Sequence, residues 1–147
     1  MNRPGLIGRS LVAAQFALIA WLIWPLTPQQ WSPPALALLA CSVMLGLWTL
    51  FHNRPGNFNI RPEPKASGQL VTGGPYGYVR HPMYSALLLF AAAEVVAYGD
   101  PWKILCGIAL ALVLLAKTVL EERGLRQRFP EYAEYAKRVR RFVPGAF

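Results

Sequence analysis

Residues 82–120 read PMYSALLLFAAAEVVAYGDPWKILCGIALALVLLAKTVL, two apolar stretches separated by the turn sequence Gly99-Asp100-Pro101. The two stretches, at about 82–98 and 102–120, approach the roughly 20 mostly apolar residues that a helix needs to cross a bilayer. Proline lacks the amide hydrogen that would continue the first helix into the second. The pattern therefore predicts an antiparallel pair of transmembrane helices in this half of the chain.

Two more apolar stretches precede this pair, at about 7–26 and 34–52, and prolines interrupt the sequence between them. Of the 147 residues, 54% are hydrophobic and only 15% are charged, whereas soluble domains carry about 25% charged residues. Too little polar sequence remains to cover a soluble core. We expect an all-α integral membrane protein with about four transmembrane helices, forming a single domain over residues 1–147.

The placement of tryptophan and of basic residues predicts the direction of insertion. The two connections that separate the paired spans carry Trp21, Trp24, Trp31 and Trp102, and tryptophan favours the headgroup region. All lysines and arginines except Lys103 lie at the opposite ends of the spans, which predicts a cytoplasmic location for both termini and the 53–81 loop. We expect a multi-pass protein of the cell inner membrane. The net charge of +8 then reflects topology and contact with anionic lipids, and no nucleic-acid partner is expected.

Two polar regions face the cytoplasm in this topology. The 53–81 loop is rich in Gly and Pro, which exclude a continuous helix, but apolar residues are interleaved throughout, so we expect a folded cap that binds cofactor. The C-terminal segment 121–147 has apolar residues at helical spacing. Pro130 predicts a break near Phe129 and a second helix over Glu131–Arg141. This segment is expected either to lie on the membrane surface or to pack on the loop, and the two interpretations are compatible.

Three short stretches differ in their residue types from an ordinary connecting loop. They are the turn Gly73-Gly74-Pro75-Tyr76, the run Arg80-His81-Pro82-Met83-Tyr84 at the start of the third span, and the pair Glu121-Glu122 at the end of the fourth. Ionisable groups near membrane depth are costly, which favours a functional role. A simple interfacial role is the alternative for each point taken alone.

The stretch LVTGGPYGYVRHPMY at 70–84, followed by the Glu-Glu pair and a tyrosine-rich tail, resembles the isoprenylcysteine carboxyl methyltransferases and related phospholipid methyltransferases. The resemblance covers about the last 80 residues. It implies an S-adenosylmethionine-dependent methyltransferase that acts on a lipophilic, membrane-embedded acceptor by in-line methyl transfer at the cytoplasmic face.

The same resemblance implies the site residues. The cofactor-binding set is Gln69, Leu70, Val71, Gly74, Tyr76, His81, Pro82, Tyr84, Glu121 and Glu122, and Arg80 joins the two glutamates as a catalytic candidate. Carboxylates suit the ammonium of S-adenosylmethionine, and aromatic faces suit its sulfonium and adenine. Arg80 or His81 suits its carboxylate. No metal is expected, because His52 and His81 lack metal-ligand spacing.

Several questions stay open at the level of sequence. The acceptor is a phospholipid amine, a prenylated thiol or carboxylate, or a small hydrophobic thiol, and membrane lipids are expected partners. The oligomeric state is undetermined. The alternatives to a methyltransferase are an NADPH-dependent membrane reductase of the sterol-reductase type and a non-catalytic membrane accessory protein. Glu94, in the third span, is interpreted as a carboxylate that reaches the outer interface or as one with an interior proton or packing role.

Overall fold

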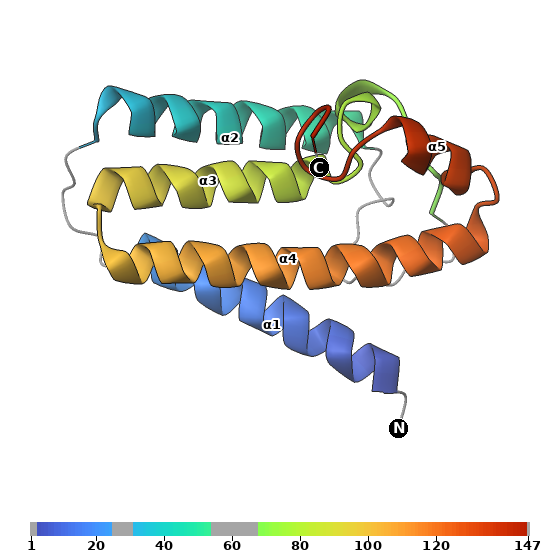
Figure 1. The fold of residues 1–147 in the computed structure, drawn as a ribbon, viewed down its shortest axis with the longest axis horizontal. Coiled ribbons are helices and arrows are strands. Elements are labelled where there is room, and N and C mark those ends of the chain that lie inside the picture. Colours follow the sequence, from blue (N-terminus) through green and yellow to red (C-terminus); the bar gives the residue numbers. More distant parts are fainter. Residues whose placement is uncertain (1–2, 25–30, 54–67, 147) are drawn as a thin grey trace.

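The computed structural model describes residues 3–24, 31–53 and 68–146 and is helical throughout its regular elements. The long helices are α1 (Arg3–Ile23), α2 (Pro33–His52), α3 (Pro82–Tyr98) and α4 (Pro101–Arg128). Two short helices, the 3₁₀ helix η1 (Gly74–Gly77) and α5 (Tyr132–Arg138), lie together at one end. In Figure 1, α2, α3 and α4 run alongside one another and α1 crosses α4 obliquely. The expected all-α membrane architecture is confirmed.

Among the described residues, three helices are long and apolar enough to cross a membrane, at Gly5–Ile23, Pro33–His52 and Pro101–Arg128, and α3 is a shorter apolar helix of 17 residues. Large apolar side chains on their outer faces are exposed, among them Phe51, Trp102 and Leu112, which suits contact with lipid. Each expected span coincides with a helix, but α1 runs from Arg3 to Ile23 instead of 7–26, and α4 continues to Arg128 beyond the expected end at 120. Residues 25–26 lie outside the described part.

Small residues allow α2 and α3 to pack closely. The Ser42 hydroxyl of α2 donates a 2.7 Å hydrogen bond to the Ala86 carbonyl of α3, and a side chain on Gly46 would meet the Ala86 methyl at 3.9 Å. Close backbone approach and interhelical hydrogen bonds are the main attractions between helices in lipid. The α2–α3 pair is therefore a closely packed base for residues 68–81, the described part of the loop between the two helices.

The turn between α3 and α4 has the structure that its sequence predicts. Gly99 ends α3 in the left-handed conformation, with φ of 62°, which glycine adopts without steric cost. The Asp100 side chain accepts a 2.8 Å hydrogen bond from the Trp102 amide and caps α4, and Pro101 occupies the first turn. This cap reverses the chain within two residues and sets α3 and α4 antiparallel.

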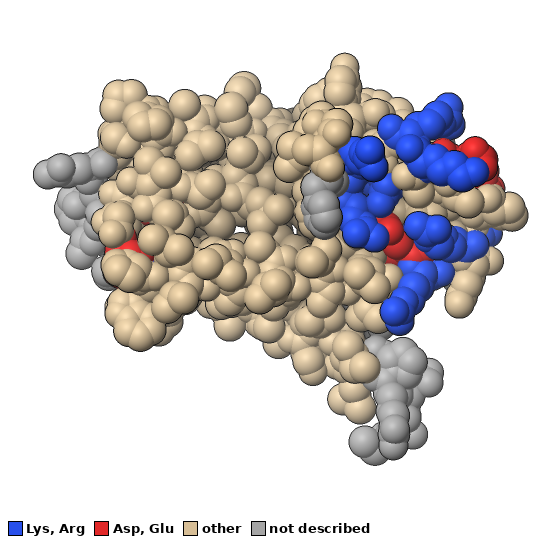
Figure 2. Space-filling model, viewed as in Figure 1, with Lys and Arg blue, Asp and Glu red and all other residues tan. Residues whose placement is uncertain are grey.

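Helix α4 is longer than a bilayer requires. Its 28 residues span about 42 Å at 1.5 Å per residue, whereas the hydrocarbon layer is about 30 Å thick. The last two turns, which begin at Glu121, therefore extend beyond the hydrocarbon. Figure 2 shows the lysines and arginines gathered around these turns and α5, with acidic side chains between them.

The C-terminal segment confirms one prediction and corrects another. The break falls where Pro130 predicts it: α4 ends at Arg128, and Phe129 is its C-cap residue. The second helix stops at Arg138 instead of Arg141, because the chain then becomes extended and Arg140 pairs with Val79 in a parallel β-bridge. The amides of Arg80 and His81 donate to the carbonyls of Arg140 and Arg141 at 2.7 and 3.1 Å.

Lys103 joins three helices at the end opposite the basic cluster. Its side chain is 3% exposed, and its ammonium donates to the carbonyls of Leu22 and Trp24 at the end of α1. The same ammonium lies 3.8 Å from the Glu94 carboxylate of α3 and 4.0 Å from the centre of the Tyr98 ring. Glu94 is buried, so the interior packing interpretation is the one that its position favours.

We predict that Lys103→Ala lowers the free energy of unfolding by about 3 kcal/mol, because it leaves the Glu94 carboxylate buried without its cation. Denaturation of the purified protein in detergent measures the change. Lys137→Ala is the matched control, since its ion pair with Glu134 is 70% exposed on both sides and should contribute less than about 1 kcal/mol. Equal losses in the two variants would contradict a structural role for Lys103.

Candidate functional site

The candidate site forms where the end of the loop, the start of α3, the end of α4 and the C-terminal tail meet. The loop reaches it through η1, whose first residue, Gly74, has φ of 56°. A β-carbon at Gly74 would lie 2.5 Å from the His52 ring at the end of α2. Gly74 therefore allows both the backbone conformation and the close contact with His52 that bring the loop back over α2.

Gly74→Ala is predicted to destabilise the cap by at least about 1–2 kcal/mol, the cost of the left-handed conformation for a non-glycine residue, because the clash with His52 adds to it. Gly73→Ala is the matched control: Gly73 has extended backbone with φ of −94°, and an added β-carbon meets His52 at an ordinary 3.5 Å. Thermal unfolding compares the two variants. A Gly73→Ala variant as unstable as Gly74→Ala would refute this account of the turn.

Glu122 is the buried centre of the site. Its side chain is 4% exposed, and Arg80 binds one carboxylate oxygen through Nη2 at 2.8 Å and Nε at 2.9 Å. Arg141 donates to both oxygens at 3.3 and 3.2 Å, and the His81 ring nitrogen Nε2 lies 3.3 Å away. Charge-assisted hydrogen bonds of this kind offset the cost of burying a carboxylate.

Arg80 extends this network to the backbone of the tail. Its Nη1 donates to the carbonyls of Ala136, at 2.9 Å, and Val139, and its own side chain is 8% exposed. Arg80 thus fixes the end of α5 to α4 through Glu122. The guanidinium is already occupied by protein groups, which favours a positioning role for Arg80 over the catalytic role predicted from the resemblance.

Glu121 has a different environment from Glu122. Its side chain is 31% exposed, and its Oε2 accepts a 3.1 Å hydrogen bond from the Tyr84 hydroxyl. The His81 ring nitrogen Nδ1 lies 3.7 Å from the same oxygen, and the His81 and Tyr84 rings are stacked with centres 5.5 Å apart. A carboxylate beside two aromatic rings, open to solvent, suits an organic cation.

Tyr76 and Tyr135 contact each other beside this arrangement. The Tyr135 hydroxyl donates to the Tyr76 carbonyl at 2.6 Å, and the Asn53 amide donates to the Tyr76 hydroxyl at 3.3 Å. Burial and the Glu121 charge raise the pKa of Tyr76 to about 12, and burial raises the pKa of Tyr135 as well. Both phenols therefore stay protonated at neutral pH and keep their ability to donate hydrogen bonds.

The structure brings together most of the predicted site residues: Tyr76, Arg80, His81, Tyr84, Glu121 and Glu122. Pro82 is buried in the first turn of α3, directly after His81, the residue before the helix. Gln69, Leu70 and Val71 lie on the extended segment that leads into η1, with Gln69 exposed and the other two half-buried. Their contribution to a cofactor site remains a prediction.

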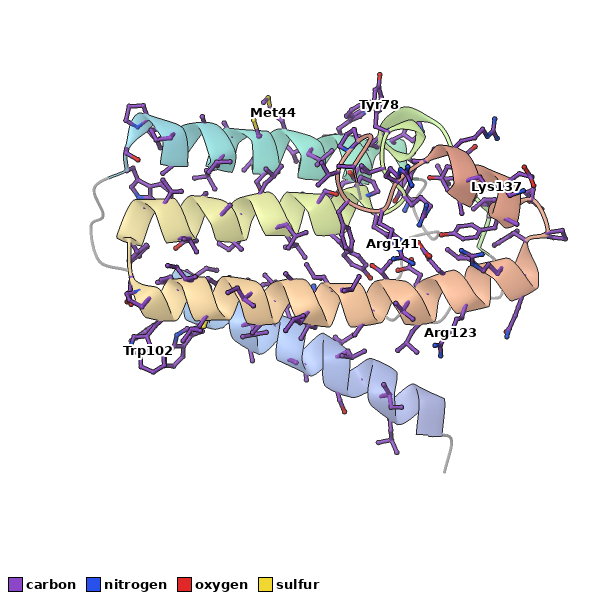
Figure 3. The ribbon with its side chains drawn as sticks, viewed as in Figure 1. Met44, Tyr78, Trp102, Arg123, Lys137 and Arg141 are labelled. Carbon is purple, nitrogen blue, oxygen red and sulfur yellow. The ribbon has the colours of Figure 1, made fainter. Side chains whose placement is uncertain are left out.

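The sequence did not single out Arg141 or Phe142. In Figure 3 the Arg141 side chain points between the tail and α4, toward Glu122, and the Phe142 ring lies against His81 with centres 6.1 Å apart. Arg141 was one of several arginines in a basic tail that was expected to be helical. Only the β-bridge at Val79 and Arg140 gives this segment the extended backbone that turns Arg141 inward.

A family model for phospholipid methyltransferases matches residues 34–132, which include α2, the loop, α3 and α4. The chain belongs to this family. The resemblance of the 70–84 stretch and the Glu-Glu pair to its members is thereby confirmed. The match also includes α2, a segment in which the sequence shows no motif of the family and resembles its members only in being hydrophobic.

Individual relatives of the chain have diverse names. The chain is 38% identical over 82 residues to the cobalt-zinc-cadmium resistance protein CzcN of Cupriavidus metallidurans, covering 54% of this chain and 38% of that protein. It is 38% identical over 90 residues to a probable protein-S-isoprenylcysteine O-methyltransferase of Oryza sativa subsp. indica, covering 58% and 46%. It is 37% identical over 81 residues to protein-S-isoprenylcysteine O-methyltransferase B of Arabidopsis thaliana, covering 52% and 40%. The matched segments thus span less than half the length of these relatives.

We predict that Glu122→Gln frees the tail from the helical bundle, because loss of the negative charge leaves Arg80 and Arg141 partly buried without a counter-ion. Hydrogen exchange measures the effect: the Arg80 and His81 amides, which bond to the tail, should lose at least tenfold in protection. Glu134→Gln, on the exposed face of α5, is the control. Unchanged protection of both amides in Glu122→Gln would show that the tail is held by other contacts.

Proposed function

We propose that the protein transfers a methyl group from S-adenosylmethionine to a lipophilic acceptor at the cytoplasmic end of the helical bundle. Membership of the phospholipid methyltransferase family supports the reaction class. The observation that carries the proposal is the partly exposed Glu121 carboxylate beside the stacked rings of His81 and Tyr84. This group of side chains fits a small, cationic and aromatic cofactor.

The residues present fit S-adenosylmethionine by chemistry. Glu121 would hold the ammonium, the Tyr84 and Tyr76 rings would face the sulfonium or the adenine, and His81 would complete the wall. The bound cofactor would supply an electrophilic methyl group, which forms a bond to the acceptor nucleophile as its bond to sulfur breaks. Alignment of such an in-line reaction supplies much of the acceleration.

Glu121 and Glu122 have separate tasks in this proposal. Glu122 is enclosed by Arg80, Arg141 and His81, so it holds the walls of the site in place. Glu121 offers the more accessible charge and is the residue proposed to contact the cofactor. His81 lies between the two carboxylates and couples the wall to the binding group.

The proton balance depends on the acceptor. An amine must reach the site unprotonated, because its lone pair forms the new bond to carbon. Glu121 is paired with the cofactor ammonium in this proposal, so the proton that an ammonium acceptor loses would pass to water at the partly exposed side of the site. A carboxylate or thiolate acceptor brings its own negative charge and needs no base.

The proposal predicts methyl-labelled lipid when the protein in detergent is incubated with methyl-labelled S-adenosylmethionine and a total lipid extract. Mass spectrometry of the extract identifies the product. Glu121→Gln should lower the rate at least tenfold, since one charge-assisted contact to the cofactor is worth about 1.5–3 kcal/mol. Glu134→Gln should leave the rate unchanged.

The two alternatives predict different outcomes. A reductase would consume NADPH and release no methylated product. An accessory protein would show no labelled lipid in wild type or in either variant. Full activity in Glu121→Gln would refute the assignment of Glu121 while leaving the reaction class intact.

A further inference from the structure

The tail is attached to the start of α3 through consecutive backbone carbonyls. The Arg140 carbonyl accepts a 2.7 Å hydrogen bond from the Arg80 amide. The Arg141 carbonyl accepts a 3.1 Å hydrogen bond from the His81 amide. The residue after His81 is Pro82, which has no amide hydrogen. Backbone pairing therefore ends there, and the next carbonyl of the tail needs a donor of another kind.

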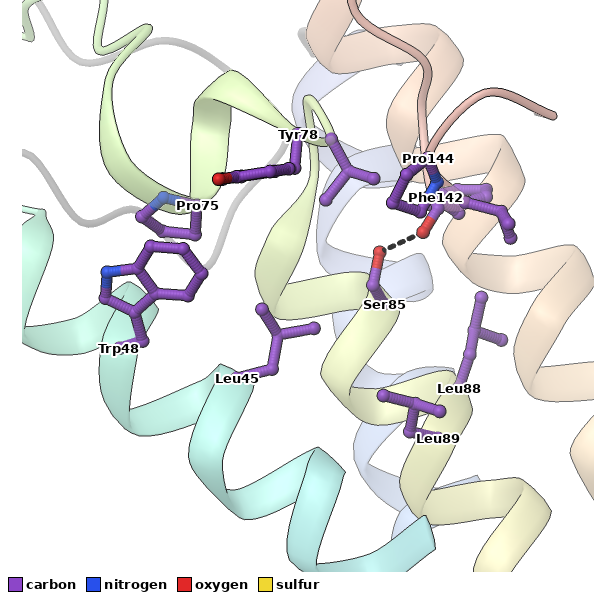
Figure 4. A pocket seen from close by; sticks show the side chains of 11 residues that line it. Leu45, Trp48, Pro75, Tyr78, Ser85, Leu88, Leu89, Phe142 and Pro144 are labelled. Atoms are coloured by element: carbon purple, nitrogen blue, oxygen red, sulfur yellow. Dashed lines mark hydrogen bonds between the residues drawn. The ribbon is translucent and has the colours of Figure 1, made fainter.

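Ser85 supplies that donor. Its Oγ lies 2.7 Å from the Phe142 carbonyl and 3.3 Å from the His81 carbonyl. A hydroxyl carries a single hydrogen, and the His81 carbonyl already accepts from the amides of Tyr84 and Ser85, each at 3.0 Å. The hydrogen therefore belongs to the shorter contact, and Ser85 donates to Phe142, as the dashed line in Figure 4 shows.

This hydrogen bond lies in apolar surroundings. Ser85 and Phe142 are 7% and 8% exposed, and Figure 4 shows them at the wall of an apolar cavity whose lining includes Leu88 and Leu89. A carbonyl that loses its donor in such a place is costly, because little water is available to replace the hydrogen bond. Loss of the Ser85 hydroxyl would therefore favour a displaced tail.

The attached tail contacts the candidate site through the His81 ring. The Phe142 ring lies against this ring with centres 6.1 Å apart and a tilt of 58°, and the Tyr84 ring stacks on it. The His81 ring has to keep one orientation, because its Nε2 lies 3.3 Å from Glu122 and its Nδ1 lies 3.7 Å from Glu121. A histidine side chain without packed neighbours samples several rotamers. The two aromatic contacts therefore restrict His81 to the orientation that faces both carboxylates.

We propose that Ser85 and Phe142 are positioning residues of the candidate site. Ser85 holds the tail through the Phe142 carbonyl, and the Phe142 ring keeps the His81 ring stacked on Tyr84 beside Glu121. The inference rests on the proposed function, because it gives these two residues the task of ordering the wall against which the cofactor would lie. Neither residue has to touch the cofactor to do so.

Histidine NMR of the full-length protein in detergent tests the positioning without any ligand. The chain contains two histidines, His52 and His81, so isotope-labelled histidine gives one ring signal for each. Ser85→Ala should move the His81 signal, because the aromatic rings around it shift, and should leave the His52 signal in place. Ser42→Ala is the matched control and should move neither signal: Ser42 is 8% exposed and also donates a 2.7 Å hydrogen bond to a carbonyl.

Isothermal titration with S-adenosylhomocysteine then links the positioning to the site. Ser85→Ala should raise the Kd at least about fivefold, as expected when a hydrogen bond that orders the site is lost, whereas Ser42→Ala should leave the Kd unchanged. Ser85→Thr should restore the wild-type Kd, because threonine keeps the hydroxyl and the cavity beside Ser85 has room for the added methyl group. A role in stability alone would affect Ser85→Ala and Ser42→Ala alike.

An unmoved His81 signal in Ser85→Ala would overturn the proposal, and so would a moved signal with an unchanged Kd or an equal rise in Kd in Ser42→Ala. Phe142→Leu gives a second test if Ser85→Ala does not fold. It keeps an apolar side chain but removes the ring, so an unmoved His81 signal in this variant would also refute the role of Phe142. A wild type that shows the two histidine signals but does not bind S-adenosylhomocysteine would instead overturn the proposed function.

Discussion

The buried carboxylate of Glu122 is the interaction on which the functional end of the molecule depends. Arg80 comes from the end of the loop, His81 from the start of α3 and Arg141 from the tail, and all three meet Glu122 near the end of α4. Arg80 and His81 are adjacent in sequence, but Glu122 and Arg141 come from segments far along the chain. A single buried charge, surrounded by cations, thus assembles a cap on a bundle whose helices are joined elsewhere by close packing and by a few polar contacts, such as the Ser42–Ala86 hydrogen bond and those of Lys103.

This arrangement gives the two adjacent glutamates different surroundings. Successive residues on a helix point about 100° apart, so one carboxylate faces the packed cap while the other faces the open side near Tyr84. Glu122 is the more buried and Glu121 the more exposed of the two. A chain with one glutamate at this point would have to use the same charge for folding and for ligand binding.

The sequence predicted the helices well because their determinants are local. Apolar length, the Gly99-Asp100-Pro101 turn and the break at Pro130 each depend on a few neighbouring residues. The same local evidence extended the last helix to Arg141, which was wrong, because the β-bridge between Val79 and Arg140 joins residues 61 positions apart. The inward position of Arg141 and the contact of Phe142 with His81 follow from that pairing. Neither contact could be predicted from the spacing of residues along the chain. The residues at 76–84 and the glutamate pair, in contrast, could be identified from the sequence.

The central proposal is that this assembled end binds S-adenosylmethionine beside Glu121, His81 and Tyr84. Isothermal titration of the purified protein in detergent with S-adenosylhomocysteine, and separately with NADPH, tests that claim most directly. The proposal predicts saturable binding of S-adenosylhomocysteine and no heat of binding for NADPH. Binding of NADPH without binding of S-adenosylhomocysteine would contradict it.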